Sequence, residues 1–129
     1  SVMWCDNQCL HCWRVIEHTL GTKIKKEDSA KKIIEECIKA QRKLLQGFKI
    51  DKNSKRKQLS KANMNKWEEA QEPTQFAISL SGEPTLYSKI GDLIEELRRR
   101  KKTSFLVTNG LHPEKVLELK KKNEKKTIC

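Results

Sequence analysis

The fold is decided by the stretch Phe76-Ala77-Ile78-Ser79-Leu80-Ser81-Gly82-Glu83-Pro84-Thr85. Its first five residues form a short apolar run without helical period, which is typical of a buried strand in a parallel sheet. The next five residues combine glycine, proline and small polar side chains and predict a loop. A strand that runs into a loop and then a helix is the repeating unit of an α/β protein.

The same order of strand, loop and helix continues on both sides of this stretch. Strands are predicted at residues 2–4, 76–80, 105–107 and from Ile128 onward, and helices at residues 30–46, 62–71, 90–102 and from Pro113 onward. Such alternation requires right-handed crossovers and a parallel sheet, which is either open or curled as part of a barrel.

Capping residues and apolar spacing define the helices. Asp28 and Ser29 are suitable N-cap residues for the helix from residue 30, and Gly47 is expected at its C-terminal end. The apolar stripe of that helix is predicted to consist of Ala30, Ile33, Ile34, Cys37, Ile38, Leu44 and Leu45. Because Cys37 falls on this stripe, it is predicted to be a small core residue and not a metal ligand. Ser88 is expected to cap the helix from residue 90.

Apolar residues in the other elements predict the rest of the core. Both strands, at 76–80 and 105–107, are expected to be buried. The helical residues expected to face inward are Met64, Trp67, Ala70, Ile90, Leu93, Ile94, Leu97, Val116, Leu117 and Leu119.

The charge of the chain is strongly positive. It has 129 residues, enough for one hydrophobic core, with 28 Lys and Arg against 17 Asp and Glu, a formal net charge of +11. This excess favours a polyanionic partner such as nucleic acid, although a solvated lysine-rich surface is the alternative. Residues 48–61 carry many of these charges and are predicted to form an exposed basic insertion.

Cysteine usage and hydropathy indicate the compartment. The chain has five cysteines, an odd number, and three of them fall within eight residues. This clustering favours a reducing compartment and a metal site over a disulfide scaffold. We find neither a membrane-span pattern nor a signal peptide, so the sequence predicts a cytoplasmic protein. The abrupt starts and stops of the terminal strands suggest a fragment of a longer protein.

Three unusual loops follow predicted strands, at residues 5–14, 81–85 and 108–110. In parallel sheets and barrels, ligands bind at the carboxyl ends of the strands. We therefore expect these three loops to line one site.

Thiols dominate the first of these loops, where Cys5, Cys9 and Cys12 are spaced as C-x3-C-x2-C. One interpretation is a zinc site completed by His11 or His18, because structural zinc is four-coordinate. The other is a [4Fe–4S] cluster, in which three cysteines bind three irons and leave the fourth iron open to a chelating ligand. The residues alone leave both possibilities open.

The C-x3-C-x2-C spacing resembles the motif of radical S-adenosylmethionine enzymes. In that family a Gly/Glu-rich turn after the second strand meets the ammonium group of the cofactor, and Gly82-Glu83-Pro84 matches this turn. Polar residues after the next strand also contact the cofactor there, and Thr108-Asn109-Gly110 occupies that place. The resemblance thus implies Cys5, Cys9 and Cys12 as cluster ligands and the two loops as the S-adenosylmethionine site.

Three longer segments narrow the resemblance to the wyosine-forming branch, the tRNA 4-demethylwyosine synthase family. They are residues 12–14, 76–87 and 104–110, with further likeness at 41–47 and 66–70. This family condenses N1-methylguanosine, beside the anticodon of phenylalanine tRNA (tRNA-Phe), with pyruvate. The resemblance implies a radical mechanism, a reductant of the flavodoxin or ferredoxin type, and a partial (β/α)6 barrel of which this chain forms roughly half.

The resemblance also implies that parts of the family's machinery lie outside this sequence. Residues 1–129 would be a partial radical S-adenosylmethionine domain, truncated at both ends. A second iron–sulfur cluster and a pyruvate-binding lysine are expected upstream, and the fragment alone is expected to be inactive. The two alternatives are a zinc-stabilised nucleic-acid-binding module and a radical enzyme with another substrate.

Overall fold

The computed structural model of the chain describes residues 4–12, 14–15, 20–22, 26–48, 64–79 and 82–124. Several predictions fall outside these ranges. They concern the first strand before Trp4, His18 as a zinc ligand, almost the whole basic insertion and the strand from Ile128.

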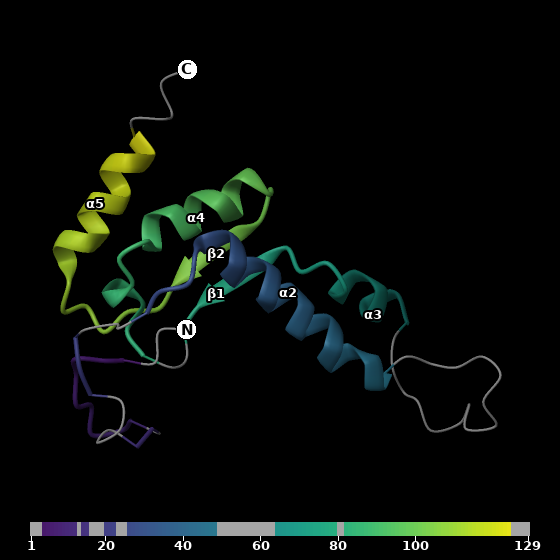
Figure 1. The fold of residues 1–129 in the computed structure, drawn as a ribbon, viewed down its shortest axis with the longest axis horizontal. Helices are drawn as coiled ribbons and strands as arrows, with labels where there is room; N and C mark the ends of the chain where they lie inside the picture. Colours follow the sequence, from purple (N-terminus) through teal and green to yellow (C-terminus); the bar gives the residue numbers. More distant parts are fainter. Residues whose placement is uncertain are drawn as a thin grey trace.

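A parallel pair of strands confirms the α/β class. Strand β1 (Gln75–Ile78) pairs with β2 (Thr103–Leu106), with Gln75 opposite Thr103 and Ile78 opposite Leu106. Helix α4 (Ile90–Arg99) lies between the two strands in the sequence and provides the crossover that parallel strands require (Figure 1). β2 begins two residues before the predicted strand, because Thr103 and Ser104 extend the ladder.

The remaining helices follow the predicted order. They are α2 (Ala30–Leu45), α3 (Met64–Ala70) and α5 (Pro113–Glu124), with short 3-10 helices η1 (Gln46–Phe48) and η2 (Pro84–Leu86). Within the described ranges, no helix is both long and apolar enough to cross a membrane.

The start of α2 is as predicted, whereas its end is not. Ser29 is the N-cap, and its hydroxyl accepts a hydrogen bond from the Lys32 backbone N–H at 3.3 Å. Asp28 contributes an ion pair with the Lys32 ammonium at 2.6 Å. Gly47 does not end the helix in a left-handed conformation. The C-cap is Gln46, which keeps right-handed helical dihedrals and continues the chain into η1.

The prediction that Ser88 caps α4 is wrong. Lys89 occupies the N-cap position and makes no capping bond with its side chain. Ser88 instead donates from its N–H and its hydroxyl to the two Glu27 carboxylate oxygens, at 2.9 and 2.5 Å. The Tyr87 hydroxyl donates to the Asp28 carbonyl at 2.7 Å. These bonds join the start of α2 to the turn before α4. Because Ser88 is engaged by Glu27, it does not cap α4.

The core lies between α2, α4 and one face of the sheet. Its fully buried apolar residues are Ile34, Tyr87, Ile90, Leu93 and Leu97. The partly buried residues that pack against them include Ile94, Phe76, Ile78, Leu106 and Leu119. The structure therefore confirms that the apolar side of α4 and the side chain of Leu119 face the core.

Helix α3 packs against the C-terminal part of α2. Its predicted stripe of Met64, Trp67 and Ala70 is partly buried, and the Trp67 indole N–H donates to the Leu45 carbonyl at 2.8 Å. The Arg42 guanidinium reinforces the contact by donating to the Gln71 carbonyl beyond the end of α3.

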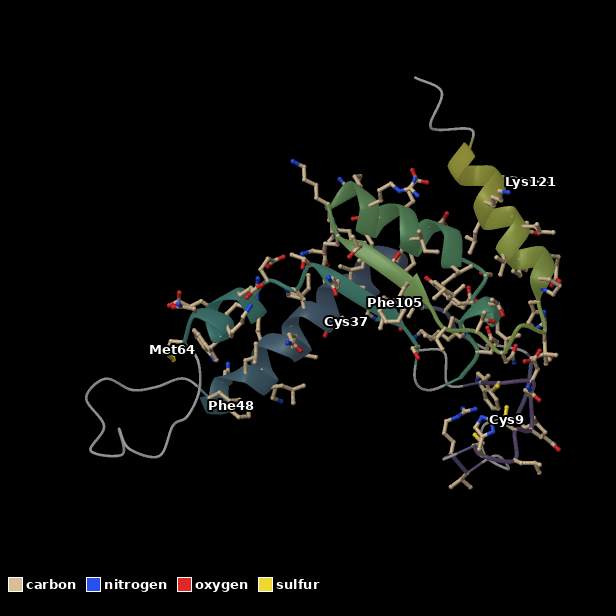
Figure 2. All side chains as sticks on the ribbon, turned by 180° about the vertical axis from the view of Figure 1, so that it is seen from behind. Cys9, Cys37, Phe48, Met64, Phe105 and Lys121 are labelled. Carbon is tan, nitrogen blue, oxygen red and sulfur yellow. The ribbon has the colours of Figure 1, made fainter. Side chains whose placement is uncertain are left out.

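The opposite face of the sheet is exposed, so the strands are covered on one side only. Phe105 and Val107 have exposed fractions of 59% and 50%. Figure 2 shows the labelled Phe105 on the side away from α2 and α4. Val116 and Leu117 of α5 are also exposed, contrary to prediction. Within the described residues, helices pack on only one face of the sheet, and Phe105 and Val107 lie on the other. Val116 lines an open cavity with Ile78 and Leu106 at the edge of the covered face.

Cys37 is exposed, which contradicts its predicted place in the core. Successive helical residues are about 100° apart around the helix axis. Viewed down the axis, Cys37 is therefore rotated by about 60° to one side of buried Ile34, and Ile38 by about 40° to the other side. The packed stripe of α2 runs through Ile34 and Ile38. Cys37 lies at the edge of that stripe, which the apolar spacing alone could not reveal.

Replacing Ile34 by Ala is expected to lower the free energy of unfolding by about 2–4 kcal/mol, because Ile34 is 1% exposed and its truncation leaves a cavity. Leu44→Ala on the same helix is the matched control, because Leu44 is 73% exposed, contrary to its predicted place on the apolar stripe. It should change stability by less than about 0.5 kcal/mol. Urea unfolding followed by circular dichroism measures both. Equal losses for the two variants would contradict this description of the core.

Candidate functional site

The three predicted loops meet around one cavity of about 350 Å³. It is lined by Cys5, Cys9, His11, Cys12, Arg14, Ser79, Gly82, Glu83, Val107, Thr108 and Asn109. In Figure 2 the labelled Cys9 lies beyond the tip of β2, whereas Cys37 lies on α2, away from this site. The prediction that the carboxyl ends of the strands bring these loops together is confirmed.

Backbone bonds fix the cysteine loop at two points. The Cys12 N–H donates to the Cys9 carbonyl at 3.0 Å, which closes a tight turn between these two thiols. The Cys5 carbonyl accepts from the Gly21 N–H at 3.0 Å, and Cys5 forms a parallel bridge with Leu20. All three cysteines are free thiols of intermediate exposure, so they can reach a bound group.

The donor set at this cavity consists of three free thiols, which is the ligand type of thiolate-bound metal centres. Among the described side chains, no three His, Cys, Asp or Glu residues are close enough together to bind a single metal ion. A [4Fe–4S] cluster places each thiolate on a different iron, so its ligands need not meet at one point. Three accessible thiols around one cavity fit this arrangement. His11 lines the cavity and is exposed.

A buried carboxylate joins the second and third loops. Glu83 is only 2% exposed, and its Oε1 accepts from the Thr85 N–H at 3.0 Å and the Thr85 hydroxyl at 2.6 Å. The Thr108 hydroxyl also donates to Oε1, at 2.7 Å, and the Asn109 N–H donates to Oε2 at 2.6 Å. The Glu83 N–H donates to the Trp4 carbonyl at 2.8 Å. Glu83 thus contacts all three chain segments that form the site.

These hydrogen bonds decide the ionisation of Glu83. Burial acts to raise the pKa of its carboxyl group, but the hydrogen bonds from Thr85, Asn109 and Thr108 outweigh burial and lower the pKa. The carboxylate therefore stays charged, and four donors of the chain's own loops already engage it.

Gly82 and Pro84 shape the second loop. Gly82 has φ of +98°, a conformation that glycine adopts without steric cost. Pro84 is buried at the start of η2, where its missing N–H costs nothing, and it is not among the residues that line the cavity. The loop residues predicted to bind a cofactor are thus divided. Gly82, Glu83, Thr108 and Asn109 line the cavity, and Pro84 supports the turn.

Sequence reasoning missed a polar chain beside Cys5. The Asn109 side-chain amide donates to Asp6 Oδ1 at 2.9 Å and approaches the Cys5 sulfur at 3.8 Å. His112 Nε2 contacts Asp6 Oδ2 at 2.5 Å. His112 and Asp6 are far apart in the sequence, and only the meeting of strand-end loops could have indicated their contact.

Both members of this pair have shifted pKa values. Burial acts to raise the pKa of Asp6, but hydrogen bonds from Asn109 and His112 outweigh it and lower the pKa. The hydrogen bond to Asp6, together with that to Glu114, raises the pKa of His112. The two shifts favour a charged pair in which the imidazolium donates to the carboxylate.

No family model matches the chain, but it has relatives among curated proteins. It is 47% identical to the S-adenosyl-L-methionine-dependent tRNA 4-demethylwyosine synthase of Pyrococcus horikoshii, over 94% of the chain and 33% of the relative. It is 33% identical to the synthase of the same name from Methanocaldococcus jannaschii, over 86% of the chain and 35% of the relative. The chain thus spans about a third of the length of these relatives.

Solved structures agree with these relatives. A structure of TYW1 with a lysine-pyruvate adduct bound has a TM-score of 0.72 and 32% identity, covering 91% of this chain and 36% of the other. The crystal structure of archaeal TYW1 has a TM-score of 0.63 and 28% identity, covering 90% and 35%. The chain is therefore homologous to one region of a class of enzymes that depend on S-adenosyl-L-methionine and act on tRNA. Within that class its homologues are the tRNA 4-demethylwyosine synthases, which confirms the family predicted from the sequence.

Replacing Glu83 by Gln is expected to lower the free energy of unfolding at pH 7 by about 2–3 kcal/mol, because the amide turns a donor toward other donors in a buried position. Because the pKa of Glu83 is lowered in the folded state, its charge stabilises the fold at pH values above the ordinary pKa of glutamate. This stabilisation is lost as the pH falls through the lowered pKa. The variant should lack this part of the acid sensitivity. Urea unfolding at several pH values measures both effects.

Glu118→Gln is the control for this prediction, because its carboxylate is exposed and pairs only at the surface with Lys115. It should unfold like the unchanged protein at every pH. An equally stable Glu83→Gln variant would show that the carboxylate does not hold the loops together.

Proposed function

We propose that the protein containing this chain is a radical S-adenosylmethionine enzyme of wyosine biosynthesis, a tRNA 4-demethylwyosine synthase. It would condense N1-methylguanosine beside the anticodon of tRNA-Phe with pyruvate. The observation that carries the proposal is the meeting of three free thiols with the Gly82–Glu83 and Thr108–Asn109 loops at one cavity. The 47% identity to a named synthase supports the same conclusion.

In this proposal Cys5, Cys9 and Cys12 bind a [4Fe–4S] cluster and leave one iron open to S-adenosylmethionine. Such a cluster would supply the electron for reductive cleavage of S-adenosylmethionine. The residues of this chain hold and shield the site. The turn between Cys9 and Cys12 keeps two thiols together, and the bonds of Cys5 to Gly21 and Leu20 fix the third.

The S-adenosylmethionine site in this proposal consists of Gly82, Glu83, Pro84, Thr108 and Asn109. Donors from Thr85, Thr108 and Asn109 already engage the Glu83 carboxylate, and its backbone N–H donates to the Trp4 carbonyl. The backbone at Gly82 is therefore the part of the loop proposed to meet the ligand. Gly82 lacks a side chain, which allows close approach to the main chain. The buried carboxylate would keep that backbone in position.

The remaining machinery is assigned to other parts of the protein. Residues 1–129 would form about half of a partial (β/α)6 radical S-adenosylmethionine barrel, with a basic insertion near 48–61. The second iron–sulfur cluster and the pyruvate-binding lysine would lie upstream in the full-length protein, and a flavodoxin- or ferredoxin-type protein would be the reductant. The lysine-pyruvate adduct named for one solved TYW1 structure supports pyruvate as the second substrate.

Anaerobic reconstitution with iron and sulfide tests the cofactor assignment. The protein should turn brown, bind about four irons at this site, and give a reduced EPR signal that shifts on addition of S-adenosylmethionine. Cys9→Ala should abolish that signal, because it removes one of three ligands. Cys37→Ala is the matched control and should keep the signal, since Cys37 lies on α2 outside the cavity.

Two results would overturn the cofactor assignment. A colourless protein that retains one zinc ion would favour the zinc-stabilised nucleic-acid-binding module. Loss of the signal in Cys37→Ala would show that the wrong cysteines had been assigned.

Binding of tRNA tests the substrate assignment. The reconstituted protein should bind tRNA-Phe that carries N1-methylguanosine more tightly than the unmethylated form. With a net charge of +11, its affinity should fall about tenfold between 50 and 200 mM salt for every two phosphates contacted. Fluorescence anisotropy with the two tRNAs measures both effects. Equal affinity for both, in a protein that shows the S-adenosylmethionine-dependent signal, would favour a radical enzyme with another substrate.

A further inference from the structure

Asp6 links the cysteine loop to the loop that follows β2. It directly follows Cys5, and its side chain is only 12% exposed. Each carboxylate oxygen has a different partner, with Asn109 on Oδ1 at 2.9 Å and His112 on Oδ2 at 2.5 Å. A nearly buried carboxylate beside a thiol, with both oxygens engaged, is fixed in orientation.

His112 is held from the other side by helix α5. Its carbonyl accepts from the Lys115 N–H at 3.1 Å, in the first turn of the helix, and Pro113 follows it directly. Its second ring nitrogen faces the Glu114 carboxylate at 3.2 Å. Figure 1 shows that α5 begins on the side of the molecule where the cysteine loop lies. His112 therefore anchors Asp6 to a regular element.

The orientation of the Asn109 amide is also determined. Its Oδ1 accepts from the Leu111 N–H at 2.9 Å, so its Nδ2 must face Asp6 and the Cys5 sulfur. One hydrogen of Nδ2 is directed to Asp6, and the other is left for the sulfur at 3.8 Å. Asp6 thereby sets the direction in which the amide donates toward Cys5.

We propose that Asp6 and His112 are positioning residues that together hold the Asn109 amide as a hydrogen-bond donor to the Cys5 sulfur. The inference rests on the proposed function, because it takes Cys5 to be a cluster ligand. Outer-shell hydrogen bonds fix metal ligands, and hydrogen bonds to cluster sulfurs tune the reduction potential. Losing this donor should leave the cluster less firmly held and harder to reduce.

His112→Ala in the anaerobically reconstituted holoprotein tests the proposal. Loss of outer-shell partners typically costs 10–100-fold in metal affinity, so iron release to a chelator should become about tenfold faster. The reduction potential of the cluster, measured by EPR-monitored titration, should become more negative. His112→Gln keeps a donor to Asp6 and should restore both readouts at least in part. Glu118→Gln, on the exposed side of the same helix, should match the unchanged protein.

A double-mutant cycle tests whether the two residues act through one another. If they do, iron release from the Asp6→Ala/His112→Ala double variant should be no faster than from the more affected single variant. Independent, multiplying effects would overturn the proposal. So would unchanged iron release and an unchanged potential in His112→Ala. If the unchanged protein assembles no cluster that responds to S-adenosylmethionine, the proposed function fails first, and this inference falls with it.

Discussion

The site depends on one buried carboxylate. Glu83 takes donors from its own loop and from the loop after β2, and its N–H bonds to the segment that leads into the first cysteine. A charged group at 2% exposure is stable only when fully hydrogen bonded, so these loops are constrained together. The site is therefore held by polar contacts at one end of the sheet, while apolar packing holds the scaffold.

The scaffold and the site occupy different parts of the molecule. Apolar packing joins α2 and α4 to one face of β1 and β2, and the residues that line the site lie beyond the carboxyl ends of the strands (Figures 1 and 2). This division follows from parallel topology, because every strand delivers its next loop to the same edge. Residues of the loops can therefore line the site while the packed residues hold the strands and helices in place.

Local patterns in the sequence predicted the order of elements and the meeting of the loops, because periodicity, caps and turn residues act over a few positions. They failed where the outcome depends on distant partners. Ser88 bonds to Glu27 and not to its own helix, and Cys37 lies just outside the packed stripe of α2. No local pattern predicts the pair of Asp6 and His112, because the two residues meet only once the strands have aligned.

The composition of the core has a consequence for the order of assembly. Within the described residues, the buried apolar cluster draws on α2, α4 and the turn before α4, and none of its members comes from the cysteine loop. Contacts such as that between Asn109 and Cys5 close a loop of about a hundred residues, whose entropic cost must be met by packing elsewhere. Small zinc domains fold around their metal. Here the thiols are brought together by a core that does not include them, so the packing of the scaffold does not depend on a group bound between the thiols.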